Sequence, residues 1–280
     1  MILFELPGPD FIVENWHHIF ITYIVPIEVA LVLIEEVSHF YLKKINFKTL
    51  LKEAFLYTGI SLISRGVYYL YIMFIFGPLV RFFKDIQFFS FHSNSIFYWV
   101  ACFIVLDCCS YWVHRLEHHN KYMWSLHDCH HSSERFHLLL RIRGNNLKPL
   151  NNIPYKLIFI LFGMHPVVIE VCTRVNKTYQ FIPHFSYLIN LGPFEHILQT
   201  PRNHIVHHAY NGKYLNKNFG ATFIIWDKLF GTYQKYDPEY ELKIGTLSGS
   251  PGYNPFYVYF RGIIELFTPK NNKKEFKKVA

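Results

Sequence analysis

The sequence has little charge for its length. Only 17% of its 280 residues are charged, whereas 51% are apolar and 19% are aromatic. Such a composition excludes a disordered chain or a coiled coil and fits a water-soluble protein poorly. The 5 cysteines have no regular spacing, which excludes a secreted disulfide framework, and no repeat of solenoid type is present. The sequence therefore predicts a protein embedded in a membrane.

The basic residues behind the net charge of +8 flank apolar stretches, because they cluster at 43–52 and 270–278. This arrangement is typical of segments beside a membrane. We expect a membrane surface as a partner and no nucleic acid. The first 18 residues contain no basic segment before an apolar run and no small-residue cleavage site, so we predict no signal peptide.

Four apolar stretches are candidates for membrane helices, since a helix needs roughly 20 apolar residues to cross about 30 Å of hydrocarbon. Residues 54–80 and 95–113 provide two of them. Residues 19–42 provide a third if their ionisable side chains face protein. The fourth, 153–193, contains Gly163 and Pro166 and predicts a broken helix or a hairpin pair. The ionisable side chains of the stretch 19–42 are Glu28, Glu35, Glu36 and His39.

The lysines between the stretches 19–42 and 54–80 place the loop that carries them in the cytoplasm by the positive-inside bias. Two further crossings return the chain to the same side for residues 114–152, and the polar residues 194–250 are expected there too. We predict a single domain over 1–280. It is an all-α integral membrane bundle of about four membrane helices, multi-pass, with a cytoplasmic histidine-rich cap that holds two metal ions.

The metal prediction comes from the histidines, which number 17. His114 and His118 are four apart and therefore share a face on a helix. A spacing of i, i+3 and i+4 occurs twice and again favours one helical face each time, with Pro201 suited to the first turn of the second helix. These triplets are His127, His130 and His131, and later His204, His207 and His208.

Three faces with two or three imidazoles each are typical of a polynuclear metal site. Together they exceed the needs of one ion, so we predict two. Imidazole suits iron, zinc, copper and nickel, and the cysteines lack the spacing of a structural zinc site. A pH-sensing histidine cluster is the alternative.

Around these histidines the chain reads HRxxH at 114–118, WxxHxxHHSSE at 124–134 and TPxxHxxHH at 200–208, followed by NFG at 218–220 and WDxxFGT at 226–232. The series resembles the fatty acid hydroxylase and sterol desaturase superfamily of integral membrane di-iron oxygenases, over about residues 95–235. The run 179–181, His184 and the run 191–195 resemble its alkylglycerol monooxygenase-like branch.

The resemblance implies that the eight histidines above are metal ligands and that a lone histidine from the intervening helix joins them. His119 follows His118 but is rotated by about 100° on a helix, so we expect it outside the ligand set. The implied ligands are His114, His118, His127, His130, His131, His184, His204, His207 and His208.

Several other residues are expected to support these ligands. Asp107, which is in the same helix as the first histidine pair, and Asp227 are predicted to accept the second N–H of ligand imidazoles. Glu117 and Asp128 are further candidates for this role. Arg143 matches a family arginine and is expected to neutralise a carboxylate or a lipid headgroup.

The activity implied by the resemblance is hydroxylation or desaturation of a lipid C–H bond by two iron ions, using O2 and two external electrons. Zinc can replace iron in purified protein. Because no dinucleotide-binding fingerprint or haem motif is present, a separate electron-donor protein is expected. The alternatives are a sterol or fatty-acyl desaturase of the same superfamily and a non-catalytic, zinc-stabilised lipid-binding protein. A metal transporter is disfavoured because the histidine clusters follow the apolar stretches instead of lying inside them.

Overall fold

The computed structural model describes residues 15, 18, 20–84, 86, 88, 95–144 and 147–268. Within these ranges the elements are all helices, accompanied by two isolated β-bridges, Leu198 with Phe223 and Ala209 with Ile244. The all-α prediction is therefore confirmed. The basic tail at 270–278 lies outside the described residues.

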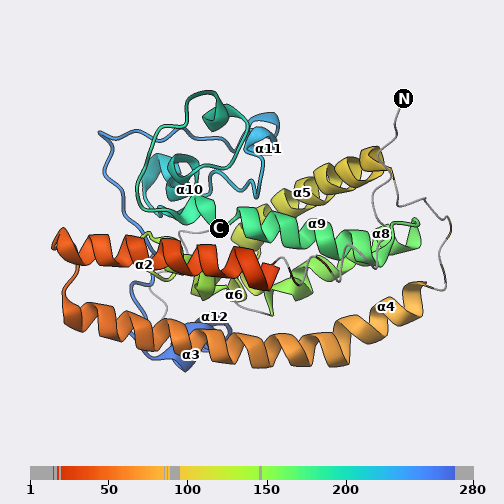
Figure 1. The fold of residues 1–280 in the computed structure, drawn as a ribbon, viewed down its shortest axis with the longest axis horizontal. Coiled ribbons are helices and arrows are strands. Elements are labelled where there is room, and N and C mark those ends of the chain that lie inside the picture. Colours follow the sequence, from red (N-terminus) through yellow and green to blue (C-terminus); the bar gives the residue numbers. More distant parts are fainter. Residues whose placement is uncertain are drawn as a thin grey trace.

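Two long helices form one side of the molecule (Figure 1). A π-helical turn at Phe20–Ile24 leads into α2 (Val25–Tyr41), and a short loop joins α2 to α3 (Phe47–Tyr71). The helix of α3 continues through a π-helical turn, Ile72–Phe76, into α4 (Gly77–Lys84). The side chain of Asn46 caps α3 by accepting a hydrogen bond from the backbone N–H of Thr49 at 2.8 Å.

A second layer consists of α5 (Ile96–His119), α8 (Ile153–Leu161) and α9 (Pro166–Tyr179). The chain turns between α8 and α9 at the stretch where the sequence predicts a break, and Gly163 there has φ of 89°, which suits glycine. Helix α9 packs against α5, and α8 packs against α4. The core between α5, α8 and α9 contains Trp99, Cys102, Leu106, Ile160, Val168, Ile169, Val171 and Cys172.

The remaining helices are short and gather at one end of this bundle. They are α6 (Lys121–Ser125), α7 (Asp128–His131), α10 (Pro201–His208) and α11 (Ile225–Leu229). Single turns of 3-10 helix connect them at Leu138–Arg143, Lys148–Asn152, Ile182–His184, Gly192–His196 and Gly212–Tyr214. Figure 1 shows α10 and α11 inside a loop-rich lobe beside the C-terminal half of α5.

One further helix, α12 (Pro255–Phe267), was not predicted from the sequence. It packs against α3, α6 and α7, and its Gly262 lies so close to Ser125 that a Cβ atom would come within 2.3 Å of the Ser125 carbonyl oxygen. The guanidinium of Arg261 in α12 pairs with both carboxylate oxygens of Asp128, and both side chains are buried. Helix α12 therefore anchors the segment that carries the second histidine motif.

Two helices of the described residues are long and apolar enough to cross a membrane. These are the continuous helix Phe47–Phe83 and α5, and only 6% of the apolar window in the first is buried. The π-helical turn before α2 and α2 together are long enough for a span but contain Glu28, Glu35 and Glu36. Helices α8 and α9 have only 9 and 14 residues, which is shorter than a usual span. The count of four membrane helices therefore stays a prediction.

Helix α2 nevertheless satisfies the condition set by its sequence. Glu35, Glu36 and His39 are buried and Glu28 is half-buried, while Leu33 and Ile34 are 59% and 65% exposed. Together with the exposed apolar side chains of α3 and α5, this leaves a broad apolar surface around the bundle. Contiguous apolar surface of this kind is typical of a protein that contacts lipid.

Candidate metal centre

The nine predicted ligands come together in two groups. In each group every histidine offers one nitrogen, and these nitrogens lie within 4.8 Å of one another. All nine side chains are buried or half-buried. The first histidine group is His114, His118, His127, His131 and His207, and the second histidine group is His130, His184, His204 and His208.

The helical spacing explains how one motif serves both groups. On a helix, residue i+4 lies about 40° from residue i, whereas i+3 lies about 60° away in the other direction. Accordingly His127 and His131 enter the first group and His130 enters the second. The expectation that each triplet presents a single face was therefore wrong, because the triplet presents two neighbouring faces.

Helix α10 repeats this division with the groups exchanged. His204 and His208, four apart, belong to the second group, and His207 belongs to the first. The rings of His131 and His208 are stacked with their centroids 4.5 Å apart, so the two groups are in direct contact. His119 is exposed and belongs to neither group, as its rotation on α5 predicts.

Backbone carbonyls fix the orientation of three of these rings. The Nδ1–H of His114 donates to the carbonyl of Phe219 at 2.8 Å, and the Nδ1–H of His207 donates to that of Lys217 at 3.0 Å. His184 donates in the same way to Gln180 at 2.7 Å. With the proton held on Nδ1, the lone pair on Nε2 points into the group. Proteins usually orient metal-binding histidines in this way, by a hydrogen bond from the ring nitrogen that does not bind the metal.

The Nε2 atoms converge without enough donors to satisfy them. In the first group, Nε2 of His127 lies 3.0 Å from Nε2 of both His114 and His131. The Nε2 atoms of His118 and His207 are buried and have no hydrogen-bond partner among the described residues. In the second group, Nε2 of His204 lies 3.1 Å from His184 and 3.2 Å from His208. Buried acceptors that lack partners are costly unless something binds them, and this donor set fits a metal ion in each group.

Burial also keeps these imidazoles neutral. It lowers the pKa of His207 to about 3, and it lowers the pKa of His130 and His208 well below the usual range, an effect that neighbouring imidazoles reinforce. A neutral imidazole needs to lose no proton before it binds a metal ion. The groups are therefore ready to bind metal at neutral pH.

A third set of potential ligands behaves differently. Glu35, Glu36 and His137 also place one polar atom each within 4.8 Å of the others. Their polar atoms already have protein partners, since His137 contacts Glu36 at 2.6 Å and the hydroxyl of Tyr57 at 2.8 Å. This set is a hydrogen-bonded network, and it does not have the unsatisfied nitrogens of the two histidine groups.

Asp107 does not accept an N–H from an imidazole, contrary to the prediction. Its carboxylate accepts from the backbone N–H groups of Thr222 and Phe223 at 2.9 and 3.3 Å and from Nε1 of Trp226 at 2.8 Å. A separation of seven residues along a helix gives the same face but also a rise of about 10.5 Å, which is too far to reach the ring of His114. Asp107 instead ties the loop before α11 to α5.

Asp227 likewise accepts hydrogen bonds from backbone N–H groups, and it influences the position of a histidine ring only indirectly. It accepts from the N–H groups of Phe219 and Gly220, both at 2.7 Å, and from the hydroxyl of Thr232 at 2.6 Å. Because the carbonyl of Phe219 holds His114, Asp227 positions that ring indirectly. Burial raises the pKa of Asp227 to about 6.

Arg143 is buried and pairs with no carboxylate in the described part of the chain. It donates to the hydroxyl of Ser132 at 3.1 Å and lies over the ring of Tyr57, with 5.3 Å from Cζ to the ring centroid. The expected neutralisation of a carboxylate is therefore not seen. Among the candidate acids, Glu117 is the one near a predicted ligand, with its carboxylate 3.6 Å from Nδ1 of His127.

The sequence did not reveal Glu35 as a residue that supports the second group. One carboxylate oxygen accepts from the backbone N–H of Leu138 at 2.7 Å and the other from that of Ser186 at 2.8 Å. Leu138 follows Phe136 by two residues and Ser186 follows His184 by two, and the rings of Phe136 and His184 stack with their centroids 6.1 Å apart. A glutamate inside an apolar helix was the available clue, but its partners lie more than 100 residues away.

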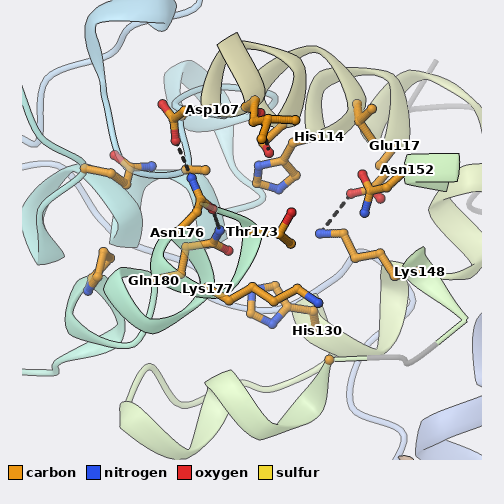
Figure 2. A pocket seen from close by; sticks show the side chains of 18 of the residues that line it. Asp107, His114, Glu117, His130, Lys148, Asn152, Thr173, Asn176, Lys177 and Gln180 are labelled. Atoms are coloured by element: carbon orange, nitrogen blue, oxygen red, sulfur yellow. Dashed lines mark hydrogen bonds and ion pairs between the residues drawn. The ribbon is translucent and has the colours of Figure 1, made fainter. Parts of the chain in front are cut away.

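The two histidine groups share a cavity of about 250 Å³. His114 and His127 line it from the first group, and His130, His184 and His204 line it from the second. Figure 2 shows His114 and His130 on opposite walls with polar side chains of α9 between them. The arrangement gives a small, partly open space that histidines of both groups border.

A family model for fatty acid hydroxylases matches residues 99–232, which include all nine histidines. The chain is 32% identical to the alkylglycerol monooxygenase of Homo sapiens over 185 residues, covering 66% of this chain and 41% of that protein. It is 29% identical to the alkylglycerol monooxygenase of Caenorhabditis elegans over 184 residues, 66% of this chain and 36% of that protein. No solved structure matches.

A bacterial relative has a different name. The ornithine lipid hydroxylase OlsE of Rhizobium tropici is 29% identical over 153 residues, covering 51% of this chain and 46% of that protein. The chain thus spans less than half the length of these relatives. The family-model match and these relatives confirm the resemblance to the fatty acid hydroxylase superfamily and to its alkylglycerol monooxygenase-like branch.

Proposed function

We propose that this protein is an O2-dependent membrane oxygenase that hydroxylates a lipid, with one iron ion in each histidine group. The observation that carries the proposal is the pair of buried histidine groups whose Nε2 atoms converge and which share one cavity. The printed names of the relatives, an alkylglycerol monooxygenase and an ornithine lipid hydroxylase, support a lipid substrate.

The iron ions would supply the activation of O2. Overall, a C–H bond and O2 become a C–OH group and water, with two electrons and two protons delivered by a separate donor protein. The chain's own residues hold neutral imidazoles in place through the carbonyls of Phe219, Lys217 and Gln180. They also bury the ligands, which limits the access of bulk water to the reacting carbon.

The experiment for this proposal is lipid mass spectrometry of iron-loaded protein given 1-O-hexadecylglycerol, O2 and a reducing system. We expect a product that has gained one oxygen atom. A product that has lost two hydrogen atoms would instead identify a desaturase. Unchanged lipid and no O2 consumption by the iron-loaded protein would favour the non-catalytic lipid-binding alternative and contradict the proposal.

We further propose that the lobe that carries the two histidine groups lies on the cytoplasmic side of a multi-pass protein. The basic loop between α2 and α3 touches that lobe, since the ammonium of Lys44 lies 5.3 Å from the ring centroid of Tyr187. A second hollow is lined by Lys43, Lys44 and Arg135 together. The positive-inside bias then assigns this end to the cytoplasm.

The orientation gives a topological prediction. Lys121 and Lys213, on the two segments that carry the histidine motifs, are expected to react with a membrane-impermeant amine reagent only after the cytoplasmic side is opened. Mass spectrometry of intact and permeabilised spheroplasts measures this labelling. Labelling of the two lysines from opposite sides would contradict a shared site.

A further inference from the structure

The cavity beside the histidine groups contains an excess of positive charge. Three cationic side chains line it, Arg141, Lys148 and Lys177, against two carboxylates, Asp107 and Glu117. The backbone and side-chain donors described above already engage Asp107. Glu117 pairs with Lys148 at 3.0 Å. The cavity wall therefore carries more cationic charge than its own acids neutralise.

Lys177 is the cation with the fewest partners. Its side chain lines the cavity and is exposed there, and no carboxylate lies within ion-pair distance in the described ranges. Glu170, seven residues earlier on the same helix, pairs with Arg174 instead. Figure 2 shows the side chains of Lys177 and Lys148 reaching into the cavity from opposite walls.

Arg141 holds the end of α9 next to this lysine. Its Nε and Nη2 atoms donate to the carbonyl of Lys177 at 3.4 and 3.2 Å. Glu28 influences Arg141 electrostatically, but the two form no ion pair. Within the described ranges the guanidinium of Arg141 thus pairs with no carboxylate, and it lines the same cavity.

A cavity lined by cations that no carboxylate neutralises attracts anionic groups, because its walls focus the positive field. The volume of about 250 Å³ is at the small end for a ligand site, which suits a polar headgroup better than a complete lipid. Lysine and arginine together bind oxyanions such as phosphate strongly. Two positive metal ions in the adjacent groups would strengthen this preference.

We propose that Lys177, Arg141 and Lys148 form a subsite for an anionic oxygen group on the lipid substrate, of the phosphate monoester or carboxylate class. The proposal rests on the proposed lipid oxygenase function. It assigns the cavity to the headgroup and predicts that the enzyme prefers an anionic lipid to its neutral analogue.

The test compares two lipids that differ only in the anionic group, 1-O-hexadecylglycerol 3-phosphate and 1-O-hexadecylglycerol, with the full-length, iron-loaded chain in lipid nanodiscs. Lys177→Ala is expected to lower kcat/KM for the phosphate lipid by about 10-fold to 100-fold, since it removes a charge-assisted contact. The neutral lipid should change by less than about 3-fold on the same reasoning. Lys177→Arg should retain most of the preference, and Lys121→Ala, a change at an exposed lysine, should match the wild type.

Equilibrium binding of both lipids to wild type and Lys177→Ala separates this inference from the proposed function. If neither lipid is oxidised but the phosphate lipid binds at least about 10-fold more weakly to the variant, the oxygenase proposal fails and the anionic subsite stands. Equal effects of Lys177→Ala on both lipids, in turnover or in binding, would overturn the subsite. Inorganic phosphate that binds in a Lys177-dependent way without any discrimination between the lipids would also overturn it, by showing a site for free phosphate.

Discussion

His118→Ala is expected to reduce bound metal and to lower product formation by more than about 100-fold, whereas His119→Ala should stay within a few-fold of the wild type. The two residues are neighbours on α5 and have the same side-chain chemistry. His118 is buried in the first histidine group, and its Nε2 atom has no hydrogen-bond partner in the part of the chain that the structure describes, whereas His119 is exposed. Removal of a ligand should cost more than the 10-fold to 100-fold typical of residues that only support ligands.

The measurement combines metal analysis with lipid product formation at equal amounts of folded protein. Thermal unfolding of both variants serves as the control, because loss of metal can destabilise the lobe that holds it. Equal losses in the two variants, or the larger loss in His119→Ala, would contradict the assignment of the first histidine group.

The sequence predicted these groups well because helical periodicity is a local property. His114 and His118 occupy successive turns of one helix, so their shared face follows from 3.6 residues per turn wherever the helix is placed. The same rule, applied strictly to the triplets, also predicts that His130 lies on a face next to the one that His127 and His131 share. What the periodicity could not provide is the position of α10 opposite α7, which makes the second group complete.

The supporting residues were harder to predict because their contacts join distant parts of the chain. Asp107 meets backbone N–H groups 115 and 116 residues later, and Arg261 meets Asp128 across 133 residues. No local pattern shows which loop folds back onto a carboxylate. A buried acid in an apolar helix, such as Glu35, indicates that a partner exists without identifying it.

The prediction of membrane helices is limited in the same way, because the sequence shows local features but not tertiary packing. The exposed apolar faces of α3 and α5 follow from composition alone, and both helices are long enough to cross. The hairpin of α8 and α9 was predicted from Gly163 and Pro166, but its depth in a membrane depends on packing against α4 and α5. Such packing is a tertiary property, so the number of crossings cannot be read from hydropathy.

His204→Ala should remove one of two metal ions selectively and abolish product formation. His204 belongs to the second histidine group, where its Nε2 lies 3.1 Å from that of His184, and the change leaves the five histidines of the first group in place. We therefore expect about two metal ions per chain in the wild type and about one in the variant, because each group has enough imidazoles for one ion. The sharp loss of activity follows if both ions are needed at the shared cavity.

His196→Ala provides the matched control, since His196 is an exposed histidine on a neighbouring turn that contacts Lys228 and belongs to neither group. It should keep two ions and nearly full activity. Elemental analysis after removal of loosely bound metal gives the stoichiometry, and thermal unfolding verifies that each variant is folded. Retention of two ions in His204→Ala would exclude this residue as a ligand. Loss of both ions from folded protein would show that the two groups bind metal as one unit, which their contact through His131 and His208 makes a direct alternative to independent sites.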